Sequence, residues 1–430
     1  MSGRGGSPET VPDIAPEGAR EGAPEHAPEA SSETVFDCVV VGGGPAGATA
    51  ASELARRGRS VVLLDREGRI KPCGGAIPPR LIEEFEIPDS LLVARITGAR
   101  IISPSARIAD MPIGKGFVGM VDRDSFDGWL RERAASLGAV RRHGVFERIE
   151  READGVMQVH CRPADRDTPG GKTDRGFVLR ARSVIGADGA RSAVARAAIP
   201  GAERMRFVFA YHEIIASPTD PSHDAASCEV HYRGSLSPDF YGWVFPHGKT
   251  TSVGLGSALK GFQLRPALDA LRKSTGLSDA KTIRREGGPI PLRPLRRWDN
   301  GRDVVLAGDA AGVVAPASGE GIYYAMTGGH LAAEAIDMFC ATGDVRALRH
   351  PRRRFMRAHG QVFWVLGIMQ RYWYSSDMRR ERFVSICRDK DVQQLTWAAY
   401  MTKELVRAKP LVHLRIFAKN IAHLTGLTSA

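Results

Sequence analysis

Apolar and polar positions follow one another along the chain in blocks that predict strands and helices in a regular order. Residues 35–41 form a short, nearly continuous apolar run, which is typical of a strand buried on both faces. Glycines follow it, then an alanine-rich helical stretch over 46–57 and a second apolar run over 60–65. This order predicts a strand–helix–strand unit, the core of a Rossmann-like α/β domain.

The pattern changes further along the chain. Between about 205 and 290, short alternating runs predict antiparallel strands, whereas a buried strand and a long helix of small residues return from 304. We therefore expect a discontinuous Rossmann-like domain with an antiparallel-sheet domain inserted into it. The predicted boundaries are a tail over 1–34, the Rossmann-like domain over 35–200 and 297–344, the inserted substrate domain over 201–296, and a helical, basic C-terminal region over 345–430.

The first residues of the chain carry a different composition. Ala-Pro-Glu recurs at 15–17, 23–25 and 27–29, and residues 1–33 hold seven acidic residues and two arginines. Such a stretch cannot bury enough apolar area to offset its chain entropy, so we expect a disordered acidic tail. It lacks the apolar segment of a signal peptide.

The remainder of the chain is strongly basic, since the net charge of the whole is +11. A basic surface attracts nucleic acid, anionic lipid or a diphosphate. We find no nucleic-acid motif, so lipid or diphosphate is the better interpretation. The six cysteines are scattered without a CxxC pair, so we expect no metal site and reduced thiols in the cytoplasm.

The glycine-rich segment 42–47, Gly-Gly-Gly-Pro-Ala-Gly, fits the GxGxxG fingerprint and lies between a strand and a helix. Gly42 permits the tight turn, Gly44 lets the backbone approach a pyrophosphate, and Gly47 lets helix and strand pack closely. Asp65 ends the next strand, where an acid accepts hydrogen bonds from a ribose. The alternative is a plain glycine turn with an exposed aspartate. The predicted dinucleotide contacts are Gly42, Gly44, Ala46, Gly47 and Asp65.

Two later segments separate FAD from NAD. Residues 186–192, Gly-Ala-Asp-Gly-Ala-Arg-Ser, and 308–312, Gly-Asp-Ala-Ala-Gly, resemble motifs of the para-hydroxybenzoate-hydroxylase-like flavoproteins. This resemblance implies bound FAD, with Asp188 near the pyrophosphate and Asp309 accepting from the ribityl chain. A helix start after 316–322 would point its amides at the flavin, where partial positive charge stabilises the reduced form. Each aspartate alone could instead form a turn or cap a helix. The implied contacts are Asp188, Gly308, Asp309, Gly319, Gly321 and Ile322.

Three further motifs resemble the geranylgeranyl reductases, a family within that group. Residues 73–76, Cys-Gly-Gly-Ala, resemble their Cys-Gly-Gly loop, and Arg123 matches an arginine beside the cofactor. Residues 238–246, Pro-Asp-Phe-Tyr-Gly-Trp-Val-Phe-Pro, resemble their substrate motif. The resemblance covers roughly 35–400. It implies a catalytic role for Cys73 in proton delivery, cofactor contacts from Gly74, Gly75, Ala76 and Arg123, and substrate contacts from Tyr241, Trp243 and Phe245.

Both parts of this interpretation have a simpler alternative. Strand geometry places the three aromatic residues on one face, and such a face more often belongs to a core than to a binding wall. Most free cysteines are small buried apolar groups.

The resemblance implies an NADPH-dependent oxidoreductase acting on CH–CH groups. It would hydrogenate isolated double bonds of a geranylgeranyl group, carried by a diphosphate or a (bacterio)chlorophyll ester, to phytyl in (bacterio)chlorophyll biosynthesis. No second glycine fingerprint lies between a strand and a helix, so NADPH is expected to reduce the flavin and leave before the prenyl substrate binds.

Two other functions remain open from the sequence. A flavin-dependent monooxygenase or halogenase of the same group is the first, although a halogenase would need a lysine after the fingerprint helix, and Lys71 is the nearest. A prenyl-binding escort protein without flavin chemistry is the second. An escort protein need not preserve the cofactor motifs, whereas this chain retains all three.

The region after residue 345 mixes basic and aromatic residues. Three arginines at 352–354 precede an apolar run over 362–369 and the aromatic residues 372–374, and 403–427 is similarly mixed. This composition is typical of interfacial segments, whereas no run reaches the ~20 apolar residues that cross a bilayer. We expect peripheral contact with the cytoplasmic membrane face, and pigment-synthesis enzymes as partners. The alternative is that these helices pack on the flavin domain.

Overall fold

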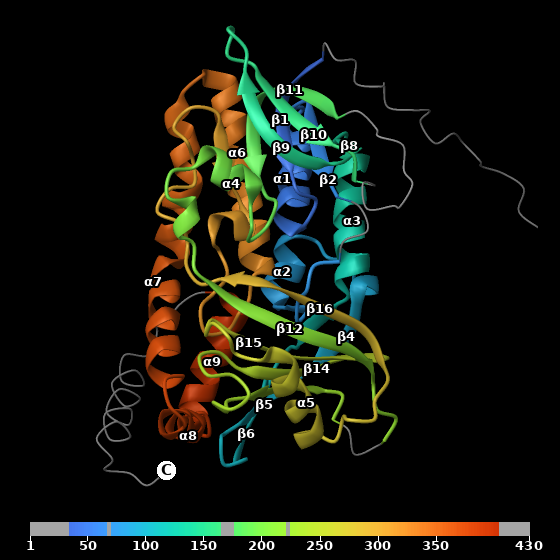
Figure 1. Ribbon diagram of the computed structural model, residues 1–430, viewed down its shortest axis with the longest axis vertical. Coiled ribbons are helices and arrows are strands. Elements are labelled where there is room, and N and C mark those ends of the chain that lie inside the picture. The colour runs from blue at the N-terminus through green and yellow to red at the C-terminus, as the bar shows by residue number, and fades with distance from the viewer. Residues whose placement is uncertain (1–33, 67–69, 165–175, 221–223, 404–430) are drawn as a thin grey trace, which may run out of the picture.

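The computed structural model describes residues 34–66, 70–164, 176–220 and 224–403. These residues form two large sheets and a small one, with helices around them (Figure 1). The predicted acidic tail up to residue 33, and most of the basic segment 403–427, lie outside the described residues.

The first sheet has the strand order β8-β2-β1-β11-β10-β9, and β17 also pairs with β11. Its central strands are parallel, because β1 pairs with β2 and β11 and β17 pairs with β11 in that sense. The chain therefore returns to its first sheet after residue 304. The strands are β1 (Val35–Val41), β2 (Val61–Asp65), β8 (Val140–His143), β9 (Val145–Arg151), β10 (Met157–Arg162), β11 (Phe177–Gly186) and β17 (Val304–Leu306).

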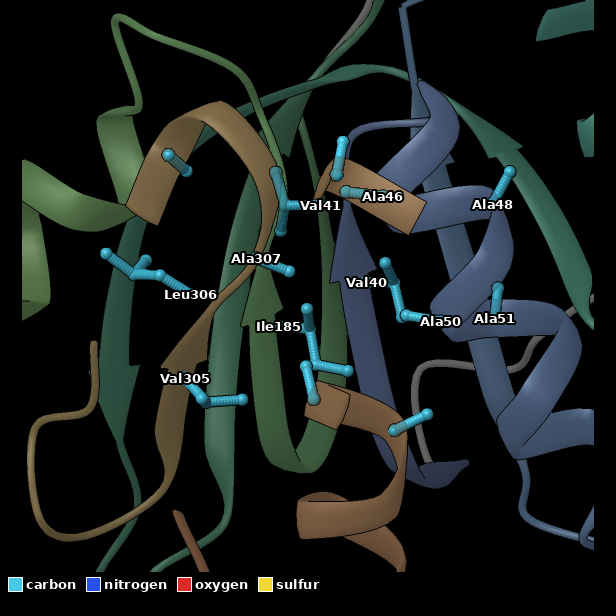
Figure 2. Packing of buried hydrophobic residues seen from close by; sticks show 14 of the residues in the cluster. Val40, Val41, Ala46, Ala48, Ala50, Ala51, Ile185, Val305, Leu306 and Ala307 are labelled. Carbon is cyan, nitrogen blue, oxygen red and sulfur yellow. The ribbon is translucent and has the colours of Figure 1, made fainter. Parts of the chain in front are cut away.

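Small side chains bring helices close to this sheet and to each other. Ala48, Ala50 and Ala51 of α1 (Pro45–Arg56) are fully buried, and Figure 2 shows Ala50 beside Val40 of β1. A Cβ on Gly329 would lie 2.1 Å from the carbonyl oxygen of Ala46, so α6 crosses α1 where only glycine fits. The other helices of this part are α2 (Pro79–Glu84), α3 (Arg123–Ser136), α4 (Ala193–Ala198) and α6 (Ile322–Thr342).

The second large sheet has the order β16-β12-β15-β14-β13-β5-β6. Its pairs are antiparallel except for β13 with β5, which is parallel. The sequence predicted this sheet within 201–296, but two strands come from before residue 120, because alternation identifies a strand without identifying its partner. The strands are β5 (Gly98–Ile102), β6 (Ile108–Pro112), β12 (Phe207–Ala216), β13 (Ser227–His231), β14 (Gly242–His247), β15 (Thr250–Ser257) and β16 (Thr282–Pro291).

The two faces of this sheet have different neighbours. Val244, Val253 and Leu255 pack against Leu268 and Leu271 of α5 (Leu264–Ser274), which covers one face. Alternate residues of the same strands point to the opposite face, which turns toward the first sheet. A three-stranded sheet contributes to the junction, in the order β3 (Ala76–Ile77), β7 (Val118–Val121) and β4 (Leu92–Ile96).

The C-terminal helices α7 (His350–Trp373), α8 (Asp377–Ile386) and α9 (Lys390–Thr402) connect both parts. In Figure 1, α7 runs along one side of the protein, from the level of the first sheet to the level of the second. Phe355 and Phe363 of α7 are buried in the first core, and Tyr374 is buried in the second. One face of α7 therefore packs on the protein body, as the alternative interpretation expected. None of the helices in the described part of the chain is long and apolar enough to cross a membrane.

Candidate cofactor and substrate site

The turn between β1 and α1 contains glycines of two kinds. Gly42 has a φ of +107°, and a Cβ there would lie 2.4 Å from the carbonyl oxygen of Ala187. A Cβ on Gly47 would lie 1.8 Å from the carbonyl oxygen of Gly42. Gly44, by contrast, has a φ of −76° and open space where its Cβ would be. The fold itself requires Gly42 and Gly47, whereas no described residue restricts a side chain at position 44, and the approach of a pyrophosphate to Gly44 stays a prediction.

The side chain of Asp65 stabilises this glycine turn. Its Oδ1 accepts a hydrogen bond of 3.0 Å from the Gly43 amide, and its Oδ2 lies 3.3 Å from Arg131 Nη1. The carboxylate is therefore held at the edge of the glycine turn, where the sequence predicted a ribose acceptor. Arg131 on α3 was missed, because nothing in its local sequence connects it with residue 65.

Asp188 stands on the next loop of the same edge, and its oxygens are engaged within the protein. Oδ1 accepts from Ser192 Oγ at 2.5 Å, and Oδ2 accepts from the amides of Ala193 and Val194 at 2.6 and 3.2 Å. Burial raises the pKa of this carboxyl. Asp188 thus binds the start of α4, as the local alternative expected, and its position near the pyrophosphate stays a prediction. Its neighbour Ala187 contacts the Gly42 turn.

The motif at residues 308–312 contacts the glycine-rich motif at residues 42–47, at the start of α1. Gly308 has a φ of +63°, and a Cβ there would lie 2.7 Å from Ala46 Cβ. Asp309 follows in the short 3₁₀ helix η4 (Gly308–Ala311), and its Oδ2 lies 2.5 Å from Lys71 Nζ. Lys71, the nearest lysine for halogenase chemistry, is thus paired with a residue of the predicted cofactor site.

The segment after η4 leads into α6, whose first residue Ile322 is buried. Gly321 precedes it without a side-chain cap, and Gly319 has a φ of +68°. The amides at this helix start are therefore available to a ligand. A Cβ on Gly321 would lie 3.8 Å from Asp309 Oδ1, so both predicted flavin contacts belong to one place.

The Cys-Gly-Gly loop lies across the aromatic strand β14. A Cβ on Gly74 would lie 3.0 Å from the Phe245 ring, and Gly75 has a φ of +71° with Val121 O and His247 directly beneath it. The Gly75 amide donates to Cys73 Sγ at 3.4 Å, and Ala76 begins β3. Gly74 and His247, which are 173 positions apart in the chain, are thereby in contact, and Cys73 lies at the junction of the two sheets.

Arg123 is buried beside this loop. Its guanidinium forms two hydrogen bonds with the Asp127 carboxylate, at 2.9 and 2.7 Å. Burial opposes its charge, yet Asp127 and then Cys73 raise the pKa of Arg123 above its ordinary value. A permanent positive charge is therefore held next to the Cys73 thiol. Contact of Arg123 with the cofactor stays a prediction.

His247 is a site residue that the sequence did not reveal. Its Nε2 lies 3.0 Å from the Gly74 carbonyl oxygen, which can only accept, so Nε2 carries the proton. Burial lowers the pKa of His247, which keeps the ring neutral. His247 thus anchors the Cys73 loop. The available signal was its place two residues beyond Phe245, on the same face of β14.

Three aromatic residues, Tyr241, Trp243 and Phe245, lie on β14 or directly before it. They pack in the protein core and lie next to the candidate site. Tyr241 Oη donates to the Ser318 carbonyl oxygen at 2.5 Å, and the Tyr241 and Trp243 ring centroids lie 6.0 Å apart. Both side chains are buried, whereas Phe245 is half-buried against Gly74. Tyr241 and Trp243 are therefore core residues of the face that the Cys73 loop crosses. Substrate contact by the three rings remains a proposal.

The end of α9 closes the same region. Lys403 forms a buried ion pair with Glu320, and its Nζ lies 3.8 Å from the Tyr400 ring centroid. Trp397 and Tyr400 also pack in the small cluster that contains Phe245. Sequence reasoning missed Glu320 and Lys403, because a lone lysine near the chain end gives no signal for a partner 83 residues earlier.

The glycine turn, Asp65 and the start of α6 define an FAD-binding oxidoreductase of the Rossmann-like class. A family model described as pyridine nucleotide-disulphide oxidoreductase matches residues 36–224. The fold is also that of a geranylgeranyl bacteriochlorophyll reductase-like protein from Thermoplasma acidophilum, with a TM-score of 0.74 at 23% identity over 88% of this chain and 99% of that one. A flavin-dependent brominase shares the fold at a TM-score of 0.66 and 17% identity, over 90% and 99%.

Sequence similarity narrows the class to one family. The chain is 56% identical over 393 residues to the geranylgeranyl diphosphate reductase of Rhodobacter capsulatus, which is 91% of this chain and 98% of the relative. The chain belongs to the geranylgeranyl diphosphate reductase family. The resemblance inferred from the motifs, and the predicted fold class, are thereby confirmed.

Proposed function

We propose that this protein is an FAD-dependent reductase that hydrogenates isolated double bonds of a geranylgeranyl group to phytyl, with NADPH as electron source, in (bacterio)chlorophyll biosynthesis. One observation carries the proposal: the Cys73 loop lies across the aromatic strand β14, and Lys71, just before this loop, pairs with Asp309 of the third cofactor motif. Family membership supports the reductase activity. Tyr241 adds a second link, since its hydroxyl donates to Ser318 O in the segment that precedes α6.

Reduction of an isolated double bond requires few chemical groups from the protein. An isolated double bond needs a hydride and a proton, and reduced FAD supplies the hydride when bound. The Cys73 thiol can donate a proton from Sγ, with Arg123 beside it to stabilise the negative sulfur that remains. The aromatic face excludes water and orients the prenyl chain. His247 fixes the loop on which Cys73 stands.

The deciding experiment measures product mass. Purified protein with NADPH is incubated with geranylgeranyl diphosphate and, separately, with geranylgeranylated (bacterio)chlorophyll. Stepwise gains of two hydrogens support the proposal, and the substrate that gives them identifies the prenyl carrier. Incorporation of oxygen or halide would instead support the monooxygenase or halogenase alternative, and a colourless protein that binds prenyl compounds would support the escort protein.

Replacing Cys73 with alanine is expected to slow prenyl reduction about a hundredfold or more, because loss of a general acid has effects of this size. FAD content and flavin reduction by NADPH should be unchanged, since the cofactor motifs are intact. Turnover and stopped-flow absorbance measure the two effects. Cys340→Ala is the matched control, because Cys340 is also half-buried but lies on α6. Unchanged turnover in Cys73→Ala would reduce Cys73 to a packing residue.

We also propose peripheral docking on a membrane surface, because the prenyl substrate is nearly insoluble in water. One face of α7 carries an exposed stripe, with Trp364 67% and Ile368 46% exposed. Arg353, Arg357 and Arg371 lie on the same helical face and are exposed. Of the three arginines at 352–354, Arg352 instead donates to Leu295 O and Arg354 pairs with Glu334. Contacts with pigment-synthesis enzymes remain a prediction.

The docking proposal predicts a specific loss. Replacing Trp364 and Ile368 together with serine should weaken flotation with anionic liposomes at low salt about tenfold or more, since burial of such side chains contributes a few kcal/mol. Ile283→Ser is the control, because Ile283 is 56% exposed on β16, away from the stripe. If the unaltered protein stays unbound at low salt, docking is wrong. If it floats and the double variant floats equally, the stripe is not the anchor.

A further inference from the structure

A buried polar chain lies beneath Trp243 on the face of the second sheet that turns toward the site. Trp243 Nε1 donates to Ser252 Oγ at 3.1 Å, and Ser252 Oγ lies 3.0 Å from His212 Nδ1. His212 Nε2 lies 3.0 Å from Glu286 Oε2. The chain crosses four neighbouring strands, β14, β15, β12 and β16, and joins an aromatic residue of the predicted substrate wall to a carboxylate.

The chemistry of the groups fixes the direction of the two outer bonds. An indole N–H only donates and a carboxylate only accepts, so Ser252 Oγ accepts from Trp243 and His212 Nε2–H donates to Glu286. The middle bond joins the Ser252 hydroxyl to His212 Nδ1. The indole N–H, the Ser252 hydroxyl and both ring nitrogens of His212 are therefore all engaged within the chain. The hydroxyl rotor is consequently fixed, and with it the position of the indole N–H.

Glu286 keeps its charge in this setting. Burial opposes ionisation, but the hydrogen bond from His212 and the charge of Arg284 outweigh it and hold the pKa of Glu286 below its ordinary value. Arg284 pairs with Glu286 and reaches Asp122 Oδ1 at 3.7 Å. A permanent anion therefore ends the chain and orients His212.

The backbone beneath the indole makes room for it at Gly254. A Cβ on Gly254 of β15 would lie 2.2 Å from Trp243 Cζ2 and 2.5 Å from His212 Cβ. The indole therefore occupies the space of a missing side chain. Burying His212 and Ser252, which are 2% and 0% exposed, is costly compared with apolar residues of similar volume. Such a network contributes a defined side-chain arrangement rather than stability.

We propose that His212 and Glu286, acting through Ser252, are positioning residues that fix the Trp243 indole and thereby select which double bond of the prenyl chain is reduced. The inference rests on the proposed function. The double bonds of a geranylgeranyl chain are chemically almost alike, so only the register of the chain along the wall can distinguish them. Trp243 sets the position of the prenyl chain along the wall. Its ring centroid lies 6.2 Å from that of Phe245, and Phe245 contacts the loop that carries Cys73.

The test compares two faces of one strand. His212→Leu removes the chain, and Glu286→Gln keeps an acceptor for His212 while removing the charge. Glu213→Gln is the matched control, because Glu213 is the next residue of β12, is equally buried, and binds Arg272 Nη1 at 2.6 Å on the opposite face. We measure the KM for geranylgeranyl diphosphate, the distribution of partially reduced products, flavin reduction by NADPH and the melting temperature.

His212→Leu should raise the KM for geranylgeranyl diphosphate about tenfold, because loss of one hydrogen bond to a charged group has a free energy of that size. The variant should also release partially reduced products. Glu286→Gln should have a smaller effect of the same kind. Flavin reduction should be unchanged in both. Glu213→Gln should lower the melting temperature and leave KM and the products as in the unaltered protein. Ser252→Ala, which removes one oxygen atom, is expected to give the same product shift and serves if His212→Leu does not fold.

Two results would overturn the inference. Folded variants with an unchanged KM and product distribution would show that the chain only packs the sheet. Equal shifts in Glu213→Gln would show a general loss of stability. If the unaltered protein reduces no prenyl compound, the proposed function itself is wrong, which is a different outcome from either.

Discussion

Replacing Gly44 with valine is expected to weaken FAD binding about a hundredfold or more while leaving the protein folded. The folded chain tolerates valine, because Gly44 has an extended backbone, with φ −76° and ψ −175°, and no atom of the described residues, its chain neighbours aside, lies within 4 Å of its Cβ position. The added side chain fills the space through which a pyrophosphate would approach the α1 amides. Flavin absorbance of the purified protein measures the loss.

Gly47→Ala is the control for this prediction, because a Cβ there would lie 1.8 Å from the Gly42 carbonyl oxygen. That variant should fail to fold or should melt far below the unaltered protein. Gly44→Val should instead keep its helical circular dichroism. Stoichiometric FAD in purified Gly44→Val would contradict the assignment of the glycine turn as the pyrophosphate site.

Replacing Lys403 with alanine is expected to lower the free energy of unfolding by about 3–5 kcal/mol, the usual effect of removing one partner of a buried ion pair. Lys403 is 2% exposed and its partner Glu320 is 7% exposed. Burial raises the pKa of Glu320 and lowers that of Lys403, so each charge depends on the other. Without the lysine, Glu320 would be buried without a partner, between the two glycines that precede α6.

Urea unfolding of the FAD-loaded protein measures this effect. A Lys403→Met, Glu320→Gln double variant is the control, because it removes both charges and should recover most of the lost stability. A loss below about 1 kcal/mol in Lys403→Ala would mean that the pair behaves as a solvent-exposed one and does not hold α9 in place.

The first sheet and its glycine turn could be predicted from the sequence because their signals are local. A buried strand, a glycine-rich turn and an alanine-rich helix occupy one continuous stretch, and each residue type has a direct physical reason there. Gly42 requires its positive φ within that stretch, and Asp65 reaches the Gly43 amide from the very next strand. The order of three such motifs was enough to indicate the FAD-binding class, whereas the family was indicated by the resemblance of residues 73–76, Arg123 and residues 238–246.

Tertiary structure decided everything that depends on distant partners. Alternation predicted the strand that carries Trp243, but its register with β15 placed the indole on Gly254 and its nitrogen on Ser252. His212 and Glu286 had no sequence signal, since their pairing follows from the neighbouring positions of β12 and β16. Asp188 shows the opposite relation. Its motif resemblance implied a position near the cofactor, whereas its carboxylate oxygens accept hydrogen bonds from the neighbouring residues Ser192 and Ala193.

The sequence by itself determined which elements form, which dinucleotide class the glycines fit and which family the chain belongs to. Only the fold decided that Cys73, Arg123 and His247 meet at one junction and that Lys403 closes it. The reason is physical: local conformation depends on neighbouring residues, whereas a site between two sheets depends on long-range packing that no short pattern records.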